Sequence, residues 1–99
     1  MNLQDAQSLH QSGDLKGAIA AYESLLEANK TDATVTHFLG MAKLQSGDTS
    51  GDEHLKKAIQ LAPENELFQT NYANHKAQLG DVETAYALFE AATQSSPHN

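Results

Sequence analysis

The sequence predicts an all-α fold, an α-solenoid of three antiparallel helix-turn-helix units with six helices in all. A Gly-Asp pair begins at residues 13, 47 and 80 of the 99-residue chain, so its copies lie 34 and then 33 residues apart. The two prolines, at 63 and 97, repeat the spacing of 34. A period of this length is typical of helical arrays in which each unit packs against the next.

The first helix of each unit is an apolar-periodic segment that ends at a glycine. These segments cover residues 3–12, 33–46 and 67–79, in units that span about 1–32, 33–65 and 66–99 of a single predicted domain. A glycine after a helix adopts the left-handed conformation that closes the helix at little steric cost. The aspartate that follows each glycine is therefore expected to cap the next helix with its carboxylate.

The second helix of each unit follows the Gly-Asp pair, and in the last two units a proline comes after it. The first of these helices is expected over residues 15–29, where apolar residues recur at helical spacing. The middle copy lacks one residue just after Asp48, and Ser50 with Glu53 offers an alternative capping box there. Small residues that allow close helix contact recur in every copy, at Ala18, Gly51 and Ala85.

The composition argues against several classes of function. The formal net charge is −7, with six lysines and no arginine, which disfavours nucleic acid and other anionic partners. There is no cysteine, and hence neither a disulfide nor a thiolate metal site. No apolar run approaches the length of a membrane span and no leader begins the chain, so we expect no membrane contact and a cytoplasmic location.

The residues that could carry chemistry are scattered along the chain. None of the five histidines has another histidine four positions away or lies in an HExxH pattern, so no metal site is expected. No serine lies in a nucleophile-elbow setting, and the short acidic clusters fall at helix starts, where they offset the helix dipole. We therefore expect neither an enzyme nor a cofactor.

The repeated residues resemble the tetratricopeptide repeat, a unit of about 34 residues and two antiparallel helices. The second unit carries the family's pattern at Leu39, Gly40, Gly47, Asp48, Leu55, Ala58 and Pro63. The third carries it at Tyr72, Ala73, Gly80, Asp81, Ala85, Phe89, Ala92 and Pro97. The first keeps it at Ala6, Gly13, Asp14, Ala18 and Tyr22. The resemblance covers essentially the whole chain, and it implies a right-handed superhelix whose concave face binds peptide segments.

Some positions depart from the family's pattern. Lys43 and Lys76 stand where a first helix usually has an aromatic residue, which suggests either looser packing there or lysine stems that lie along apolar surface with the charge held outward. Asp5 replaces a large apolar residue, as is expected of a terminal repeat. One variety of the family clamps a C-terminal carboxylate with lysine and arginine. The corresponding positions here lack those cations, so no such binding is expected: they hold Leu3, Gln7, Phe38, Leu67 and Asn71.

The resemblance implies a groove lined by the first helices of the three units. Carried over position by position, the groove residues are Gln7, His10, Gln11, His37, Phe38, Met41, Gln45, Thr70, Asn71, Asn74 and Gln78. Such a surface is neutral, rich in amides and partly apolar. It suits a neutral or basic protein segment held by amide hydrogen bonds and a few apolar anchors. The alternative is that these are ordinary solvated helix positions.

Two functions are compatible with this sequence. The chain is either a protein-binding scaffold in its own right or a docking or oligomerisation arm of a larger bacterial enzyme, such as a glycosyltransferase, sulfotransferase or hydroxylase, with no catalysis in this segment. The last unit bears on the choice, because nothing follows to cover the apolar side that includes Tyr86 or Leu88 beside Phe89. We favour a segment of a longer protein over a homodimer through Leu88 and Phe89, and expect the isolated segment to self-associate.

Overall fold

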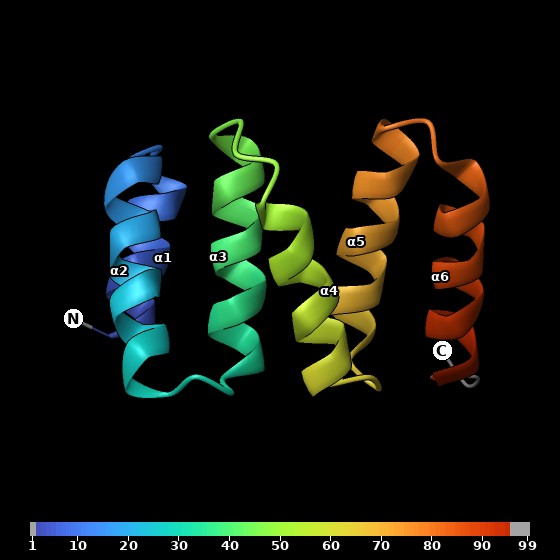
Figure 1. Cartoon of the computed structure of the whole chain (residues 1–99), viewed down its shortest axis with the longest axis horizontal. Helices are drawn as coiled ribbons and strands as arrows, with labels where there is room; N and C mark the ends of the chain where they lie inside the picture. Colours follow the sequence, from blue (N-terminus) through green and yellow to red (C-terminus); the bar gives the residue numbers. More distant parts are fainter. Residues whose placement is uncertain (1, 96–99) are drawn as a thin grey trace. The chain divides into compact units, whose positions relative to one another are not determined.

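The computed structural model describes residues 2–95, and all regular elements in this range are α-helices (Figure 1). Each predicted helix boundary stated above lies within one residue of an observed one, which confirms the predicted helices. Pro97, expected just beyond the last helix, lies outside the described residues. In chain order the helices are α1 (Leu3–Gln11), α2 (Leu15–Ala28), α3 (Ala33–Gln45), α4 (Gly51–Leu61), α5 (Glu66–Gln78) and α6 (Val82–Ser95).

The helices belong to two compact units. Unit 1 covers residues 1–61 and contains α1–α4, and unit 2 covers residues 62–99 and contains α5 and α6. In unit 1, α1 packs on α2, α2 on α3 and α3 on α4; in unit 2, α5 packs on α6. The arrangement of both units as a single right-handed superhelical domain stays a prediction.

The Gly-Asp pairs close one helix and start the next. The backbone angle φ is 91°, 92° and 87° at Gly13, Gly47 and Gly80, in the left-handed region that suits glycine. Asp14 Oδ1 accepts the Gly17 N–H at 2.9 Å and so caps α2, and Asp81 Oδ1 accepts the Thr84 N–H at 3.2 Å at the start of α6. The predicted aspartate caps are confirmed at both places.

The middle repeat begins its second helix late. α2 and α6 start two residues after their glycines, whereas α4 starts four residues after Gly47. Asp48 Oδ1 accepts the Ser50 N–H at 2.9 Å in an Asx turn, and the Glu53 N–H donates to the Ser50 main-chain carbonyl at 3.2 Å instead of the hydroxyl. The predicted Ser50–Glu53 capping box is therefore wrong, and so is the expected cap of α4 by Asp48, because the Asp48 carboxylate closes a turn that precedes the helix.

A capping box forms instead at α1, where none was expected. Asn2 Oδ1 accepts the Asp5 N–H at 2.9 Å, and Asp5 Oδ2 accepts the Asn2 N–H at 3.3 Å. Each side chain thus satisfies a main-chain donor that the first turn of a helix leaves without an intrahelical partner. The aspartate that replaces an apolar residue of the family pattern stabilises the start of the first helix.

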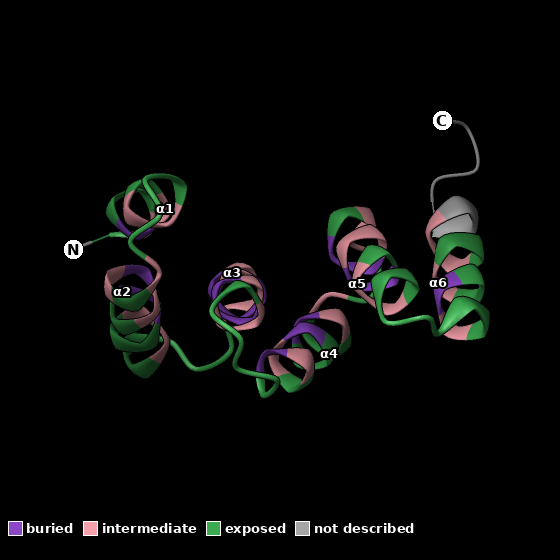
Figure 2. Ribbon diagram, turned by 90° about the horizontal axis from the view of Figure 1, so that it is seen from above, coloured by how far each residue is buried: buried purple, intermediate pink, exposed green. Residues whose placement is uncertain are grey.

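α3 is the most enclosed helix of unit 1, as Figure 2 shows by its burial colours. α4 approaches it backbone to backbone: a Cβ atom added to Gly40 would lie 2.8 Å from the Gly51 carbonyl oxygen, and one added to Gly51 would meet the Gly40 carbonyl oxygen. The close contact predicted at Gly51 is therefore confirmed. The buried residues of α3 are Val35, Thr36, His37, Leu39, Gly40 and Ala42.

Candidate protein-interaction surfaces

His10 joins three helices of unit 1. Its Nε2 lies 2.7 Å from Gln45 Oε1 on α3, and its Nδ1 lies 3.1 Å from the hydroxyl oxygen of Tyr22 on α2. Because Gln45 Oε1 can only accept, Nε2 carries the proton and Nδ1 accepts the hydroxyl hydrogen of Tyr22. Burial raises the pKa of Tyr22, which keeps that hydroxyl protonated as a donor.

Aromatic rings continue from this junction along α3. The Tyr22 ring lies edge-on to His10, with centroids 5.8 Å apart, and stacks on Phe38, with centroids 6.2 Å apart and an interplanar angle of 18°. Phe38 in turn meets the His37 ring edge-on at 5.2 Å. Such contacts hold ring positions beyond what the burial of apolar area alone would do. They keep the half-buried Phe38 side chain in a defined place.

Six of the predicted groove residues of unit 1 have solvent-accessible side chains. Gln11 and Gln45 are exposed, and the other four are half-buried. The bond between His10 and Gln45 joins α1 and α3, the two helices that carry them. We refer to this surface as the α1–α3 face: Gln7, His10, Gln11, Phe38, Met41 and Gln45.

His37 is the exception among the predicted groove residues. The structure buries it completely, at 0% exposure, so its ring has no surface to offer a ligand. Desolvation by burial lowers the pKa of His37 to about 4, which keeps the ring neutral near neutral pH. The expectation for His37 was wrong because assigning the family's groove positions to this sequence assumes that each assigned side chain faces outward. In this structure α3 is enclosed over most of its circumference.

The predicted groove residues of unit 2 lie on α5. Thr70 and Asn71 are half-buried, and Asn74 and Gln78 are exposed. The spacing of four between Thr70, Asn74 and Gln78 places these residues on one side of the helix. A continuous groove that combines them with the α1–α3 face stays a proposal.

A cleft between α2 and α4 was not anticipated from the sequence. It is an open cleft of about 320 Å³, and it is lined by Glu23, Leu26, Glu27, Lys30, Leu39, His54 and Lys57. α2 and α4 supply the charged walls, while α3 contributes the 1%-exposed Leu39. Three of these residues, Glu23, Leu26 and Glu27, lie on α2 at i, i+3 and i+4, which is a sequence signal for one helix face, and Lys30 follows just after the helix ends at Ala28. The cleft was not predictable from this signal alone, because its other wall, with His54 and Lys57, comes from a helix distant in sequence from α2.

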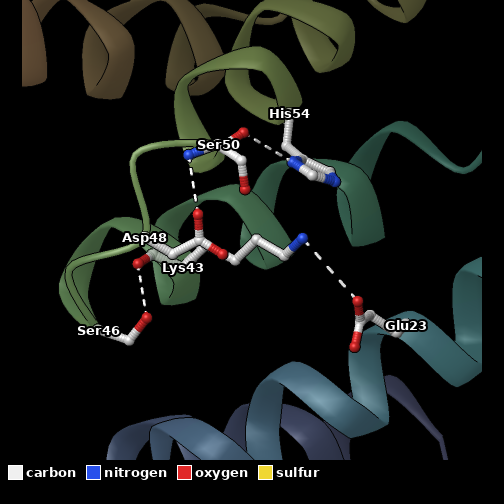
Figure 3. A network of polar contacts seen from close by, with 6 residues as sticks. All are labelled: Glu23, Lys43, Ser46, Asp48, Ser50 and His54. Carbon is white, nitrogen blue, oxygen red and sulfur yellow. Dashed lines mark hydrogen bonds and ion pairs between the residues drawn. The ribbon is translucent and has the colours of Figure 1, made fainter.

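A polar network borders the cleft (Figure 3). Lys43 Nζ lies 3.9 Å from Glu23 Oε2, and the lysine side chain is only 15% exposed, which confirms a stem held along the protein surface. On α4, His54 Nδ1 lies 3.1 Å from the Ser50 carbonyl oxygen, so Nδ1 carries the hydrogen. The hydrogen bonds from Ser50 hold the pKa of Asp48 below its usual range. Turn and cleft are thus connected by short polar contacts.

α6 has an exposed apolar stripe. Val82, Tyr86 and Phe89 are 68%, 64% and 39% exposed, and their spacing of four and three places them on one side of the helix. Leu88, predicted together with Phe89 as a dimer contact, is half-buried. The accessible apolar residue beside Phe89 is therefore Tyr86.

The described residues were compared with the geometry of metal-ion sites and with the length of a membrane span. No group of three histidine, cysteine or acidic side chains there is arranged to hold a metal ion. Among residues 2–95, no helix is both long and apolar enough to cross a lipid bilayer.

These features define the protein first as an α-helical repeat protein. The family model for the tetratricopeptide repeat matches residues 5–32. A relative, the BBSome complex member BBS4 of Xenopus tropicalis, is 33% identical over 97 residues, which is 97% of this chain but 19% of the relative. The chain thus spans about a fifth of the length of this curated relative.

Solved structures show the same fold. A crystal structure of MamA superimposes with a TM-score of 0.84 at 17% identity, over 93% of this chain and 54% of that one. A MamA RS-1 double mutant gives a TM-score of 0.87 at 22% identity, over 95% and 53%. The matched repeat over residues 5–32 and the helical-repeat fold both agree with the tetratricopeptide repeat family.

Proposed function

We propose that the chain is a protein-interaction module whose α1–α3 face binds a peptide segment. The observation that carries the proposal is the 2.7 Å bond between His10 and Gln45, because it joins the two helices that bear this face. A surface that is fixed before binding loses less conformational entropy when the ligand arrives. The family's general role as a protein-binding scaffold supports the proposal.

The chemistry of the face suggests what the segment looks like. Gln45 uses its amide oxygen for His10, which leaves the amide nitrogen to donate to a peptide carbonyl. The exposed Gln11 offers a donor and an acceptor to the same backbone. Half-buried Phe38 and Met41 give apolar anchor points, and methionine adapts readily to irregular shapes. A neutral or basic segment with one or two apolar side chains suits this face and the acidic surface of the chain.

A peptide-display selection against the chain tests the proposal. Selected peptides are expected to contain apolar residues without a run of acids, and Met41→Glu should weaken their binding about tenfold or more by placing a carboxylate among the anchors. Ser24→Glu is the matched control, because it adds the same charge at an exposed position of α2. Peptides that bind both variants as tightly as the unchanged chain would refute binding at this face.

The second function, a docking or oligomerisation arm of a larger protein, stays a prediction. The reported relatives are longer than the matched segment, since it covers 19% of BBS4 and 54% of the first MamA chain. An antibody raised against this segment would reveal the mass of the native product in its source cells. A band far above 10.7 kDa supports the arm, and a band at that mass rejects it.

A further inference from the structure

The cleft between α2 and α4 is lined by two lysines and two glutamates, on a chain that is acidic overall. Lys30 and Lys57 stand on its two walls, and neither forms an ion pair with another described residue. Of its two carboxylates, Glu23 is already paired with Lys43. Charges more than about 8–10 Å apart are largely screened at physiological salt. The charges of the side chains that line the cleft, rather than the net charge of −7, therefore decide what binds there.

α6 has an exposed aromatic ring between negative charges, which complements the two lysines of the cleft. Tyr86 is 64% exposed, with Glu83 three residues before it and Glu90 four residues after it. Residues at these spacings are neighbours on a helix surface, so the ring is flanked by two carboxylates. Both glutamates are exposed, and neither forms an ion pair within residues 2–95.

We propose that α6 of one copy of the chain docks in the α2–α4 cleft of a second copy. The Tyr86 ring would cover Leu26 and Leu39, in a cleft whose 320 Å³ lies at the small end of the range for ligand pockets. Its hydroxyl would donate to the Glu27 carboxylate at the rim. Tyrosine suits such a place because it has an apolar body and a polar end.

The flanking charges fix the direction of docking. Glu83 and Glu90 on α6 would meet Lys30 and Lys57 on the cleft walls, so the contact joins two different surfaces. Each copy offers one of each, and such head-to-tail contacts build rings or open chains. A single helix in a cleft buries less than the roughly 1,200 Å² of a stable interface, so the association is weak and grows with concentration. It uses faces other than the α1–α3 face and does not depend on peptide binding there.

Sedimentation velocity of the 99-residue chain, from micromolar to millimolar concentration at physiological salt, tests this inference. The expected result is a concentration-dependent rise in mass that weakens as salt is added. Tyr86→Ser should raise the dissociation constant about tenfold or more, because a buried tyrosine anchor is lost. Lys16→Glu changes an exposed lysine of α2 that does not line the cleft and should leave association nearly unchanged.

A charge exchange gives the sharper result. One variant carries Lys30→Glu with Lys57→Glu, and the other carries Glu83→Lys with Glu90→Lys. Each alone should be monomeric, because its cleft and its α6 then have the same sign. Mixed together they should associate again, since every cleft finds an α6 of opposite charge.

The inference fails if the unchanged chain stays monomeric at millimolar concentration. It also fails if the chain associates but Tyr86→Ser and the charge variants do so equally well, or if the mixture does not recover association. A monomeric chain that binds an unrelated acidic peptide in the cleft would equally overturn it. Because all the substituted residues are exposed, circular dichroism should show an unchanged helix content in every variant.

Discussion

His10 Nε2 on α1 lies 2.7 Å from Gln45 Oε1 on α3, a hydrogen bond between residues 35 positions apart. It joins the first helices of two successive repeats, while the other ring nitrogen contacts Tyr22 in the second helix of the first repeat. A hydrogen bond of this kind contributes about 0.5–1.5 kcal/mol to the free energy of unfolding. It stabilises the contact between repeats more than the fold of either one.

We expect His10 and Gln45 to be energetically coupled. Urea unfolding of His10→Ala, of Gln45→Ala and of the double variant should give a coupling of about 1 kcal/mol, because the second substitution removes nothing once the bond is lost. Gln11→Ala removes an exposed glutamine of the same face and should change stability by less than about 0.5 kcal/mol. Additive effects of the two single substitutions would contradict the bond.

The stability of the chain should fall as the pH is lowered from 6.5 towards 4 because of His37. Burial lowers its pKa in the folded state from 6.5 to about 4, so the unfolded state binds more protons in this window. The effect of His37 on the free energy of unfolding is constant above pH 6.5. Below that pH the free energy of unfolding decreases progressively, by at most about 3 kcal/mol in total. Urea unfolding at several pH values between 7 and 5 measures the slope.

His37→Gln separates this effect from other acid-sensitive groups. The variant keeps a neutral polar side chain at the buried position but has no proton to bind between pH 6.5 and 5. Its free energy of unfolding should therefore vary less with pH over this range than that of the unchanged chain. If both proteins show the same slope, another group is responsible.

Two glycines of the middle repeat should respond to alanine for different reasons. Gly51→Ala would place a methyl group against the Gly40 carbonyl oxygen, and pushing α3 and α4 apart should reduce stability by about 1–3 kcal/mol. Gly47→Ala meets open space but strains a residue with a φ of 92°, at about 1–2 kcal/mol. Asparagine, which tolerates this conformation, should therefore be milder than alanine at 47 and worse at 51. Thermal unfolding of the four variants decides between the two mechanisms.

The aspartate cap of α2 should be replaceable by asparagine but not by alanine. Asp14 Oδ1 accepts the Gly17 N–H at 2.9 Å, and an amide oxygen can accept the same bond. Asp14→Ala should reduce stability by about 1 kcal/mol, whereas Asp14→Asn should stay close to the unchanged chain. Equal losses in the two variants would mean that the carboxylate charge matters more than the cap.

The helices were predictable because the signals that set them are local. A glycine that needs positive φ, an aspartate after it and apolar residues at helical spacing each act over a few positions. The His10–Gln45 bond and the burial of His37 depend on how helices 20 or more residues apart meet, and one sequence gives no measure of that. The cleft was not predictable for the same reason. The charged residues of α2 can be recognised from their spacing in the sequence, but Lys57 on the other wall comes from α4.

The contact of Gly40 with Gly51 also constrains how this sequence can change over generations. Both glycines occupy positions at which the two sister repeats have alanine, and all four of those alanines are buried: Ala6, Ala18, Ala73 and Ala85. Either glycine, changed alone to alanine, would collide with the backbone of the other helix. Alanine at both positions, as in the sister repeats, would need both changes together with a shift of the helix. The middle repeat can therefore accept alanine at either position only if α3 and α4 move apart, at a cost in stability.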